Sequence, residues 1–441
     1  MTSGRAIRRF AGAVALVVLS LTTVQSQAVK PLETFDAAWT IIRDTHFDRS
    51  MNGVNWDAVR TELRPRAETA RSDSELRNVI GDMLGRLGQS HFALIPSSVD
   101  AYAGPSDLSG TPGFDVRLVD SDLIVAHVEA DSSAASSGVH AGWLLTAVDG
   151  KPVKDALTAL PATMPARLRQ VEAWRISQSK LRGPQGSTVP MTFIDGGGNP
   201  VTVTVTRRPE GGAPVTVGSL PTMYVRVNSA GRRTPAGKTA GVIAFNVWMP
   251  LVDGLFLKAV DEFRSADGIV IDLRGNPGGI AGMLMGISGH FLTEAKPIGI
   301  MKTRDAELRF PSNPRRVSAA GRPVEPFAGP VAILIDGMTG SASECFAGGM
   351  QSIGRVRVFG QPSMGQALPA LFNKLPNGDI LVHAYGDFVT SNGTRLEGRG
   401  VIPDETVPLR REDLLAGRDV VLERALAWID TAAPSRDADR R

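Results

Sequence analysis

The chain has 441 residues, of which 42% are hydrophobic and 21% charged, a composition typical of a globular protein with two to four domains. Its formal net charge is +3 and its Lys and Arg residues are scattered, so the sequence does not favour a nucleic-acid partner. The single cysteine, Cys345, excludes an intramolecular disulfide and a cysteine cluster for zinc, and the histidines are too widely spaced for an HExxH-type site. We therefore expect no metal and no cofactor.

The N-terminus has the pattern of a secretory signal peptide. Three arginines precede an apolar stretch at 10–24, and the small-residue sequence Ser26-Gln27-Ala28 follows it. The alternative is a membrane anchor, but the stretch is short for a spanning helix, which needs about 20 residues. We expect residues 1–28 to be removed and the chain to be exported to the periplasm or the medium. No later segment is apolar enough to predict a stable membrane span.

Two regions of different character follow the signal peptide. Residues 30–104 are predicted to be helical, because Phe35, Trp39, Ile42 and His46 recur at helical spacing. Residues 105–210 are predicted to form a separate β-rich domain. Short β-type runs lie at 116–118, 123–125, 144–148, 191–194 and 201–206. The last run alternates Val and Thr, as a half-buried strand does.

From residue 211 to 432 the pattern becomes that of an α/β domain. A strand at 241–245 precedes a helix whose apolar face lies within 252–263. Further strands are expected at 269–273 and 331–335, and their nearly uninterrupted apolar runs predict burial on both faces of a parallel sheet. A last helix is expected around 421–429, and residues 433–441 form a polar tail.

The segment after the strand at 331–335 is the first candidate for chemistry. A tight turn at 337–340 leads into Ser341-Ala342-Ser343-Glu344 and then into a helix. Free N–H groups at a helix start stabilise negative charge and can form half of an oxyanion hole, so a serine there is well placed for nucleophilic attack. The alternative is that Ser341 or Ser343 only caps the helix, with Glu344 adding charge to its first turn.

A second loop leaves the neighbouring strand. Residues 272–279 read DLRGNPGG, and the paired glycines would let backbone N–H groups approach a ligand closely. In open α/β sheets, sites form beyond the carboxyl ends of the strands, where both loops would lie. A plain Pro-Gly turn is the alternative.

These two loops resemble the C-terminal processing (tail-specific) serine peptidase family, whose pattern is similar to DLRGNPGG followed by GSASECFAGGMQSIGRVRVFG. The resemblance implies a ClpP/crotonase-like α/β peptidase core, an inserted PDZ-like domain at 105–210 and a helical N-terminal region. The PDZ-like signals are the sequences at 113–116, 138–143 and 148–150. One usual feature is absent, because Trp143 stands where an acidic residue is common.

The resemblance also implies roles for individual residues. Ser341 would be the nucleophile, with Ser343 as its rival within the motif. Gly278 and the amide of Ala342 would donate to the oxyanion. Gly113 and Phe114 would bind the terminal carboxylate of a peptide that adds as an extra strand. The implied partners are therefore protein or peptide substrates, bound through their C-terminal tails.

The general base departs from the best-known members, which use a lysine. Gln366 stands at the lysine position, and an amide cannot accept a proton usefully near neutral pH. Lys374 is near in sequence but lies outside the motif. One interpretation is a catalytically inactive peptide-binding protein on the same scaffold. The other is a base from elsewhere, and histidine is the obvious candidate because its pKa lies near working pH.

A second branch of the family, which resembles the tricorn core protease, uses a Ser–His–Ser–Glu tetrad. Ser90, His91 and Glu397 fall where that branch would have its remaining members. The expected function is therefore a metal-free serine endopeptidase in which His91 activates Ser341, and Ser90 and Glu397 orient His91. An esterase or amidase on the same fold is a further alternative. Asp272, Arg274 and Asp404 are interpreted as structural, and the oligomeric state is left open.

Overall fold

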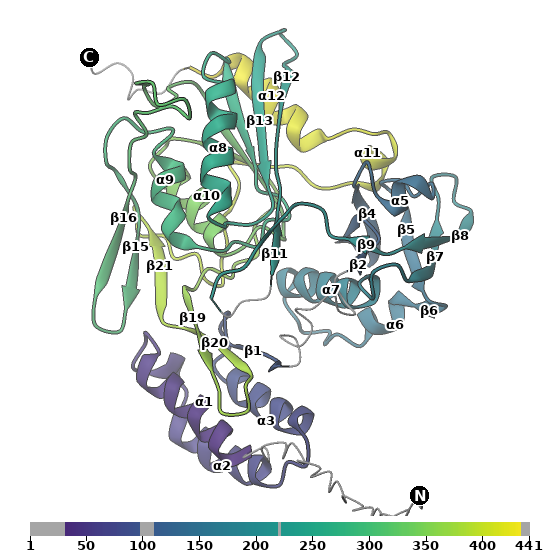
Figure 1. The fold of residues 1–441 in the computed structure, drawn as a ribbon, viewed down its shortest axis with the longest axis vertical. Helices are drawn as coiled ribbons and strands as arrows, with labels where there is room; N and C mark the ends of the chain where they lie inside the picture. The colour runs from purple at the N-terminus through teal and green to yellow at the C-terminus, as the bar shows by residue number, and fades with distance from the viewer. Residues whose placement is uncertain (1–30, 98–109, 219–221, 434–441) are drawn as a thin grey trace, which may run out of the picture.

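The structure is a computed structural model that describes residues 31–97, 110–218 and 222–433 (Figure 1). The predicted signal peptide and residues 434–441 of the predicted polar tail lie outside the described residues. In these three ranges no helix has the length and apolar character needed to cross a membrane.

Three helices form the N-terminal region, with a 3-10 turn at Met51–Gly53 between the first two; they are α1 (Pro31–Thr45), α2 (Trp56–Glu68) and α3 (Asp73–Gly85). Asn55 and Ser72 cap α2 and α3 by accepting backbone N–H groups. The indoles of Trp39 and Trp56 each donate to the backbone carbonyl of the other, at 3.0 and 3.1 Å.

The region predicted as wholly helical also contains a short strand. β1 (Ala93–Ile95) pairs antiparallel with β20 (Ile380–Ala384), which in turn pairs with β19 (Ala370–Lys374). Leu375 and Leu381 belong to the same apolar cluster as α1, α2 and α3. The N-terminal helices therefore pack on a hairpin that comes from the C-terminal half of the chain (Figure 1).

Residues 110–209, which we call the inserted domain, have a core of their own. β2 (Gly110–Thr111) pairs with β9 (Arg208–Pro209) and closes the insertion at its base. The antiparallel sheet has the order β3-β4-β5-β7-β8, with β6 (Lys151–Pro152) paired to β5, so β3 is an edge strand. The strands of this sheet and the helices of the inserted domain are β3 (Phe114–Val119), β4 (Asp122–Val128), α5 (Ser133–Ser136), β5 (Leu144–Val148), α6 (Val153–Thr158), α7 (Ala166–Leu181), β7 (Thr188–Ile194) and β8 (Pro200–Thr206). Trp143 stacks edge-on against Phe193 in this core, an apolar role for the position where an acidic residue was expected.

A six-stranded sheet forms the centre of the remaining chain, in the order β12-β13-β14-β17-β18-β22. β12 (Val227–Arg233) is antiparallel to its neighbour, and the other strands are parallel: β13 (Thr239–Phe245), β14 (Gly268–Asp272), β17 (Val331–Ile335), β18 (Arg357–Gly360) and β22 (Glu405–Thr406). Ile269 and Ile271 of β14 pack into one apolar cluster and Val270 into another, so this sheet is buried on both faces as its pattern predicts.

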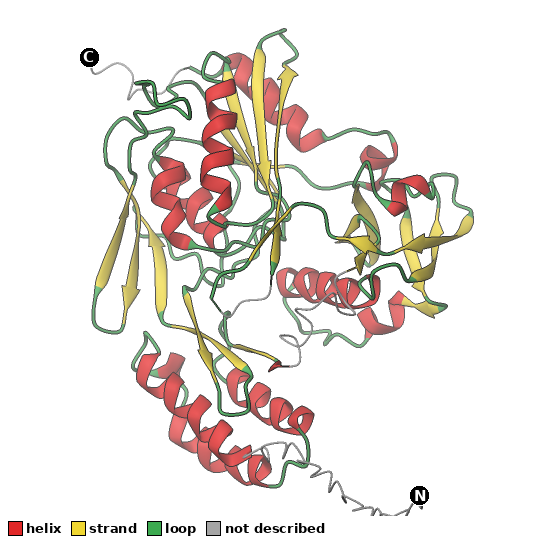
Figure 2. Cartoon of the chain, viewed as in Figure 1, coloured by secondary structure: helices red, strands yellow, loops and turns green. Residues whose placement is uncertain are grey.

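Helices cover the two faces of this sheet (Figure 2). One face packs against α8 (Leu251–Glu262), α9 (Leu284–Ser288) and α10 (Ala342–Ser352), and the other against α12 (Val420–Thr431). A second sheet, which the sequence patterns did not predict, has the order β16-β15-β21. The remaining elements are β10 (Ala213–Val215), β11 (Met223–Val225), a 3-10 turn at Ala281–Met283, β15 (Pro297–Thr303), β16 (Glu307–Pro311), β21 (Gly386–Thr390) and α11 (Arg411–Leu415).

Candidate active site

Ser341 lies where β17 gives way to α10, and its backbone is strained. Its φ of 51° and ψ of −118° are far from the extended conformation of an ordinary N-cap residue. Such conformations cost of order 1–3 kcal/mol and cluster at active sites. Ser341 is partly exposed, so a substrate can reach its hydroxyl. The backbone therefore distinguishes Ser341 from a serine that only caps a helix.

Ser343, the rival within the motif, has a different environment. Its side chain is fully buried, and its hydroxyl accepts a hydrogen bond from Nε1 of Trp248 at 2.8 Å. The same indole packs against Phe346 of α10, so Trp248 holds the start of this helix in place. Ser343 is therefore placed as a structural residue.

The other predicted catalytic residues form one hydrogen-bonded chain, which consists of Glu397, Ser90 and His91. Ser90 Oγ lies 2.8 Å from Oε2 of Glu397 and 2.8 Å from Nδ1 of His91. The backbone N–H of Ser90 also donates to Oε1 of Glu397, at 2.9 Å. Glu397 is buried, and its Oε2 accepts a further hydrogen bond from the N–H of Ala367 at 2.9 Å. The structure thus brings together residues that are 307 positions apart in the chain.

This chain of hydrogen bonds sets the tautomer of His91. A carboxylate only accepts, so the single hydroxyl proton of Ser90 goes to Glu397. Ser90 Oγ then accepts from Nδ1–H of His91, which leaves Nε2 with its lone pair. A histidine in this tautomer can take a proton at Nε2 as a general base.

The N-terminal region holds the loop that carries His91. Nδ2 of Asn52 donates to the carbonyl of Leu87 at 2.9 Å, and Nε2 of His46 lies 3.0 Å from Oε1 of Gln89. His91 itself has a φ of 60°, a conformation that is uncommon for a bulky residue. The helical region therefore positions the candidate base.

Burial, and then the nearby charge of Arg175 on α7, lower the pKa of His91 to about 4. The imidazole is therefore neutral at pH 7, as a general base must be. Within the described ranges, the hydrogen bonds of His91 include none to Ser341. In this conformation the candidate base is oriented by Ser90, but it is not hydrogen-bonded to Ser341.

The two predicted oxyanion donors differ in their present hydrogen bonding. The N–H of Ala342 is the first of α10 and has no acceptor among the described residues. The N–H of Gly278 donates to Oδ1 of Asn276 at 3.0 Å, so it is engaged in this conformation. Gly278 still lies directly against the nucleophile, because a Cβ built on it would stand 2.6 Å from Cβ of Ser341.

Comparison with known proteins identifies two regions of the chain. Residues 224–407 match peptidase family S41, and residues 28–85 match the tricorn protease C1 domain. A carboxyl-terminal-processing protease of Picosynechococcus sp. is 26% identical over 380 residues, covering 84% of this chain and 82% of that protein. The chain contains a peptidase family S41 domain at residues 224–407. It is a serine-type peptidase of the carboxyl-terminal-processing group.

Other relatives support both parts of the sequence resemblance, to carboxyl-terminal-processing proteases and to the tricorn protease. Putative tricorn protease homolog 2 of Streptomyces coelicolor is 25% identical over 412 residues, covering 89% of this chain and 32% of that protein. Among solved structures, a photosystem II D1 C-terminal processing protease matches with a TM-score of 0.58 at 21% identity, covering 90% of this chain and 98% of that one. Mature CPAF complexed with lactacystin matches with a TM-score of 0.61 at 14% identity, covering 91% and 99%. These structures share the mixed α/β fold.

Among the hydrogen bonds of the described residues, none joins the side chain of Lys374 or Gln366 to Ser341. Lys374 is exposed at the end of β19, in the hairpin that packs on the N-terminal helices. Gln366 acts through its backbone: its carbonyl accepts from the Ser341 N–H at 3.0 Å, and its N–H donates to Glu344 at 3.0 Å. Glu344 is a functional candidate that the sequence interpretation treated only as helix-start charge. Its S-x-x-E spacing from Ser341 is the signal that could have found it.

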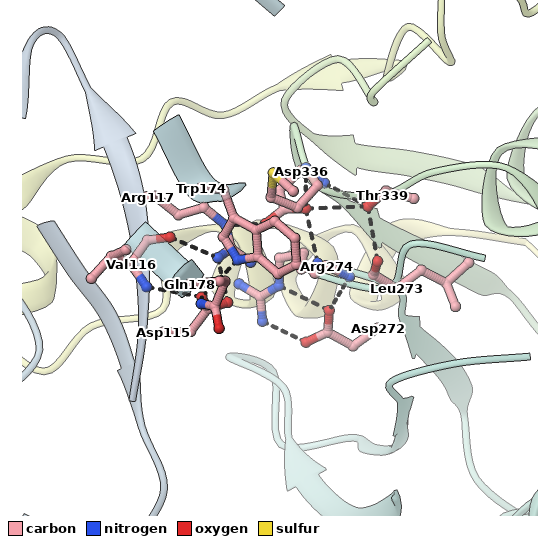
Figure 3. A network of polar contacts seen from close by, with 12 residues as sticks. Asp115, Val116, Arg117, Trp174, Gln178, Asp272, Leu273, Arg274, Asp336 and Thr339 are labelled. Carbon is pink, nitrogen blue, oxygen red and sulfur yellow. Dashed lines mark hydrogen bonds and ion pairs between the residues drawn. The ribbon is translucent and has the colours of Figure 1, made fainter. Parts of the chain in front are cut away.

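A polar network joins the inserted domain of this S41 peptidase to the catalytic loops (Figure 3). Nε of Arg117, on β3, lies 2.8 Å from Oδ2 of Asp336 at the end of β17, and Arg117 also pairs with Asp115. Asp336 accepts the N–H groups of Gly275 and Met338, at 2.9 and 3.0 Å. Burial would raise the pKa of Asp336, but the Arg117 charge and these N–H groups hold it below its usual value.

Two further features border this network. Arg274 pairs with Asp272 and Asp419, which confirms its structural interpretation. The N–H of Val358 donates to Asp404, which is likewise structural. A cavity of about 840 Å³ opens between the inserted domain and the core, and its lining includes Phe114, Trp174, Pro277 and Asp336.

The predicted peptide-binding residues lie at the start of edge strand β3. Gly113 has a φ of 82°, and a Cβ there would stand 2.1 Å from Cβ of Ser132, so only glycine fits. Its N–H donates to the hydroxyl of Thr111 at 3.2 Å. Phe114 is buried against Phe193 and also lines the cavity.

Proposed function

We propose that this S41 peptidase is a serine endopeptidase that works through a Ser–His–Ser–Glu arrangement. Ser341 attacks the scissile carbonyl, and Nε2 of His91 takes its proton and later returns it to the leaving amine. Ser90 and Glu397 hold the imidazole in the required tautomer and stabilise the imidazolium. The N–H of Ala342 stabilises the oxyanion. The single observation that carries the proposal is the hydrogen-bonded chain Glu397–Ser90–His91 with its open Nε2.

Two local rearrangements accompany catalysis in this proposal. His91 and Ser341 come within hydrogen-bond reach when substrate binds, since such contacts often tighten only in the complex. The N–H of Gly278 turns from Asn276 toward the oxyanion and joins Ala342. The change at Gly278 lies in a glycine-rich loop, where glycine adopts other backbone conformations at low cost.

We further propose that the inserted domain is a PDZ-like module and that residues 211–432 form a ClpP/crotonase-like core. The open edge of β3 supports strand addition by a substrate, with Gly113 and Phe114 receiving its C-terminal carboxylate. The cavity beside Phe114 reaches Pro277 and Asp336, next to the catalytic loops. Export through residues 1–28 would place the enzyme in the periplasm or the medium.

Cleavage assays test this function. We expect Ser341→Ala to abolish cleavage of fluorescein-labelled casein and His91→Ala to reduce it about a hundredfold or more. Ser90→Ala and Glu397→Gln act through the imidazole and should reduce it less. Full activity of His91→Ala would exclude His91 as the base. Mass spectrometry of products from matched peptides with a free or an amidated C-terminus tests recognition of the C-terminal carboxylate, and equal cleavage of both would exclude it.

A further inference from the structure

The carboxylate of Glu344 is the most highly connected acceptor beside the nucleophile. Its Oε2 accepts the N–H of Ser341 and the N–H of Gln366, both at 3.0 Å. Its Oε1 accepts the hydroxyl of Ser363 at 2.5 Å and the N–H of Gly365 at 2.6 Å. One buried side chain on the first turn of α10 therefore holds both the nucleophile and the segment 363–366.

The same segment continues directly to the base. The N–H of Ala367, one residue beyond Gln366, donates to Oε2 of Glu397 at 2.9 Å. Glu397 in turn holds Ser90, and Ser90 holds His91. Consecutive N–H groups of residues 366 and 367 are thus bound by two different carboxylates, one attached to the nucleophile and one to the base.

Additional contacts stiffen this segment, which we call the 363–367 strut. The hydroxyl of Ser363, which donates to Glu344, also accepts the N–H of Val401 at 2.7 Å. The N–H of Gly398 donates to the carbonyl of Gly365 at 3.0 Å, so the residue after Glu397 is tied to the strut as well. Arg167 of α7 crowds Gly365 from outside, since a Cβ there would stand 2.3 Å from its guanidinium.

Burying a carboxylate is costly, and burial raises the pKa of Glu344 to about 7 even though four donors stabilise its charged form. A helix start needs only one of these bonds, because in a capping box the N3 carboxylate accepts the N–H of the N-cap residue alone. The other donors come from the strut, across 19 to 22 positions of sequence. Glu344 thus accepts more hydrogen bonds than capping requires, and the additional bonds indicate that it fixes the strut.

We propose that Glu344 is a positioning residue that, through the 363–367 strut, fixes the placement of Ser341 relative to Glu397, the carboxylate that anchors Ser90 and His91. This inference rests on the proposed function, since it assumes that Ser341 and His91 react together. In place of a base, the loop supplies a rigid spacer with one carboxylate at each end. Glu344 itself touches neither substrate nor the proton in transfer.

Reaction with a fluorophosphonate probe tests the proposal, because it measures the nucleophile without a known substrate. In Glu344→Gln the side-chain amide directs its N–H groups toward the N–H and O–H donors of the strut. Hydrogen bonds between residue 344 and the strut are therefore lost. We expect the maximal inactivation rate per folded molecule to fall about tenfold or more, with the half-saturating probe concentration within about twofold. Glu344→Asp keeps the charge on a shorter stem and should restore part of the rate.

Asp379→Asn is the matched control. Asp379 is also fully buried and accepts hydrogen bonds from Arg77, Ser97 and Asn377, but it lies at the hairpin under the N-terminal helices. We expect it to lower the melting temperature and leave the probe rate within about twofold. If Glu344 has a purely structural role, Glu344→Gln will likewise lower the melting temperature and leave the probe rate within about twofold. That result would overturn the proposal.

Two outcomes separate this inference from the proposed function. If Ser341→Ala still reacts with the probe, the proposed function fails. If Ser341→Ala is unreactive but Glu344→Gln reacts at the wild-type rate, only the positioning role fails. Should Glu344→Gln not fold, Ser363→Ala removes a single donor and keeps the charge. We then expect the probe rate to fall about threefold or more, and an unchanged rate would overturn the proposal.

Discussion

At the scale of single residues, the nucleophile and the oxyanion loop are in contact so close that no added atom fits. Gly278 has a φ of 104°, and its hypothetical Cβ would stand 2.6 Å from Cβ of Ser341 and 2.8 Å from N of Ala342. Gly278→Ala must therefore push the two loops apart. We expect cleavage of casein to fall about a hundredfold, because small misplacements of reacting groups cost that much.

Gly282→Ala is the control for this substitution, since a Cβ there meets nothing within 4 Å. It should keep its activity within about twofold, given that surface changes usually cost little. Retention of most activity by Gly278→Ala would show that the loops separate without loss, contrary to this prediction.

The charge of Arg175 acts on His91 from the inserted domain. Burial is the larger cause of the lowered His91 pKa and Arg175 the second. In Arg175→Gln, protonation of His91 becomes easier, so its pKa rises toward its usual value. Activity should then be lost at a higher pH on the acid side of the profile of probe reaction rate against pH.

Arg169→Gln, on the same helix, is the control for Arg175, because Arg169 is not among the causes of the His91 shift. The acid limb of its profile should coincide with that of the wild type. An acid limb that stays in place in Arg175→Gln as well would mean that this charge does not reach His91.

At the scale of elements, Arg117 links the inserted domain to the core through an ion pair with Asp336, directly after β17. The Arg117 side chain is only 15% exposed, and its guanidinium lies between the carboxylates of Asp115 and Asp336. Arg117→Met would leave Asp336 buried without its cation. Breaking such a pair from one side costs about 3–5 kcal/mol, so we expect a large loss of stability in urea unfolding and a loss of cleavage.

The matched variant for this ion pair is Arg182→Met. Arg182 pairs with Glu210 at 2.9 Å, and its side chain is 37% exposed. Loss of an exposed pair costs about 1 kcal/mol or less. Equal destabilisation by both variants would show that the Arg117 pair is no stronger than a surface pair.

Elements with a clear period could be predicted from the sequence, and contacts across the chain could not. The strands at 269–273 and 331–335 followed from their apolar runs, and the structure places them at 268–272 and 331–335. The pairing of Ser90 with Glu397 came from resemblance alone, because no local pattern links residues 307 positions apart. The Arg117–Asp336 pair, 219 positions apart, was missed for the same reason.

At the scale of the whole molecule, a buried histidine makes stability depend on pH. His290 is fully buried, and among the described residues neither of its ring nitrogens has a hydrogen-bond partner. Burial, and then the charges of Arg315 and Arg264, lower its pKa to about 3. Below its usual pKa of 6.5, the unfolded chain binds a proton that the folded chain does not, so stability falls as pH falls.

His290→Leu should remove the part of this dependence that comes from His290, while the lowered pKa values of His91 and His383 still contribute. Between pH 6.5 and pH 5 the wild type should lose about 2 kcal/mol more unfolding free energy than the variant, as measured in urea. His140→Gln, at an exposed position, should follow the wild type. Parallel curves for His290→Leu and the wild type would mean that His290 is protonated or hydrogen-bonded in the folded protein.

The central claim is that Ser341 is a nucleophile activated by His91. Peptide mapping by mass spectrometry after reaction with a fluorophosphonate probe at pH 7 tests it most directly. We predict one adduct, on Ser341, in the wild type, and an adduct formed about a hundredfold more slowly in folded His91→Ala. An adduct on Ser343, or full-rate labelling of Ser341 in His91→Ala, would contradict the account.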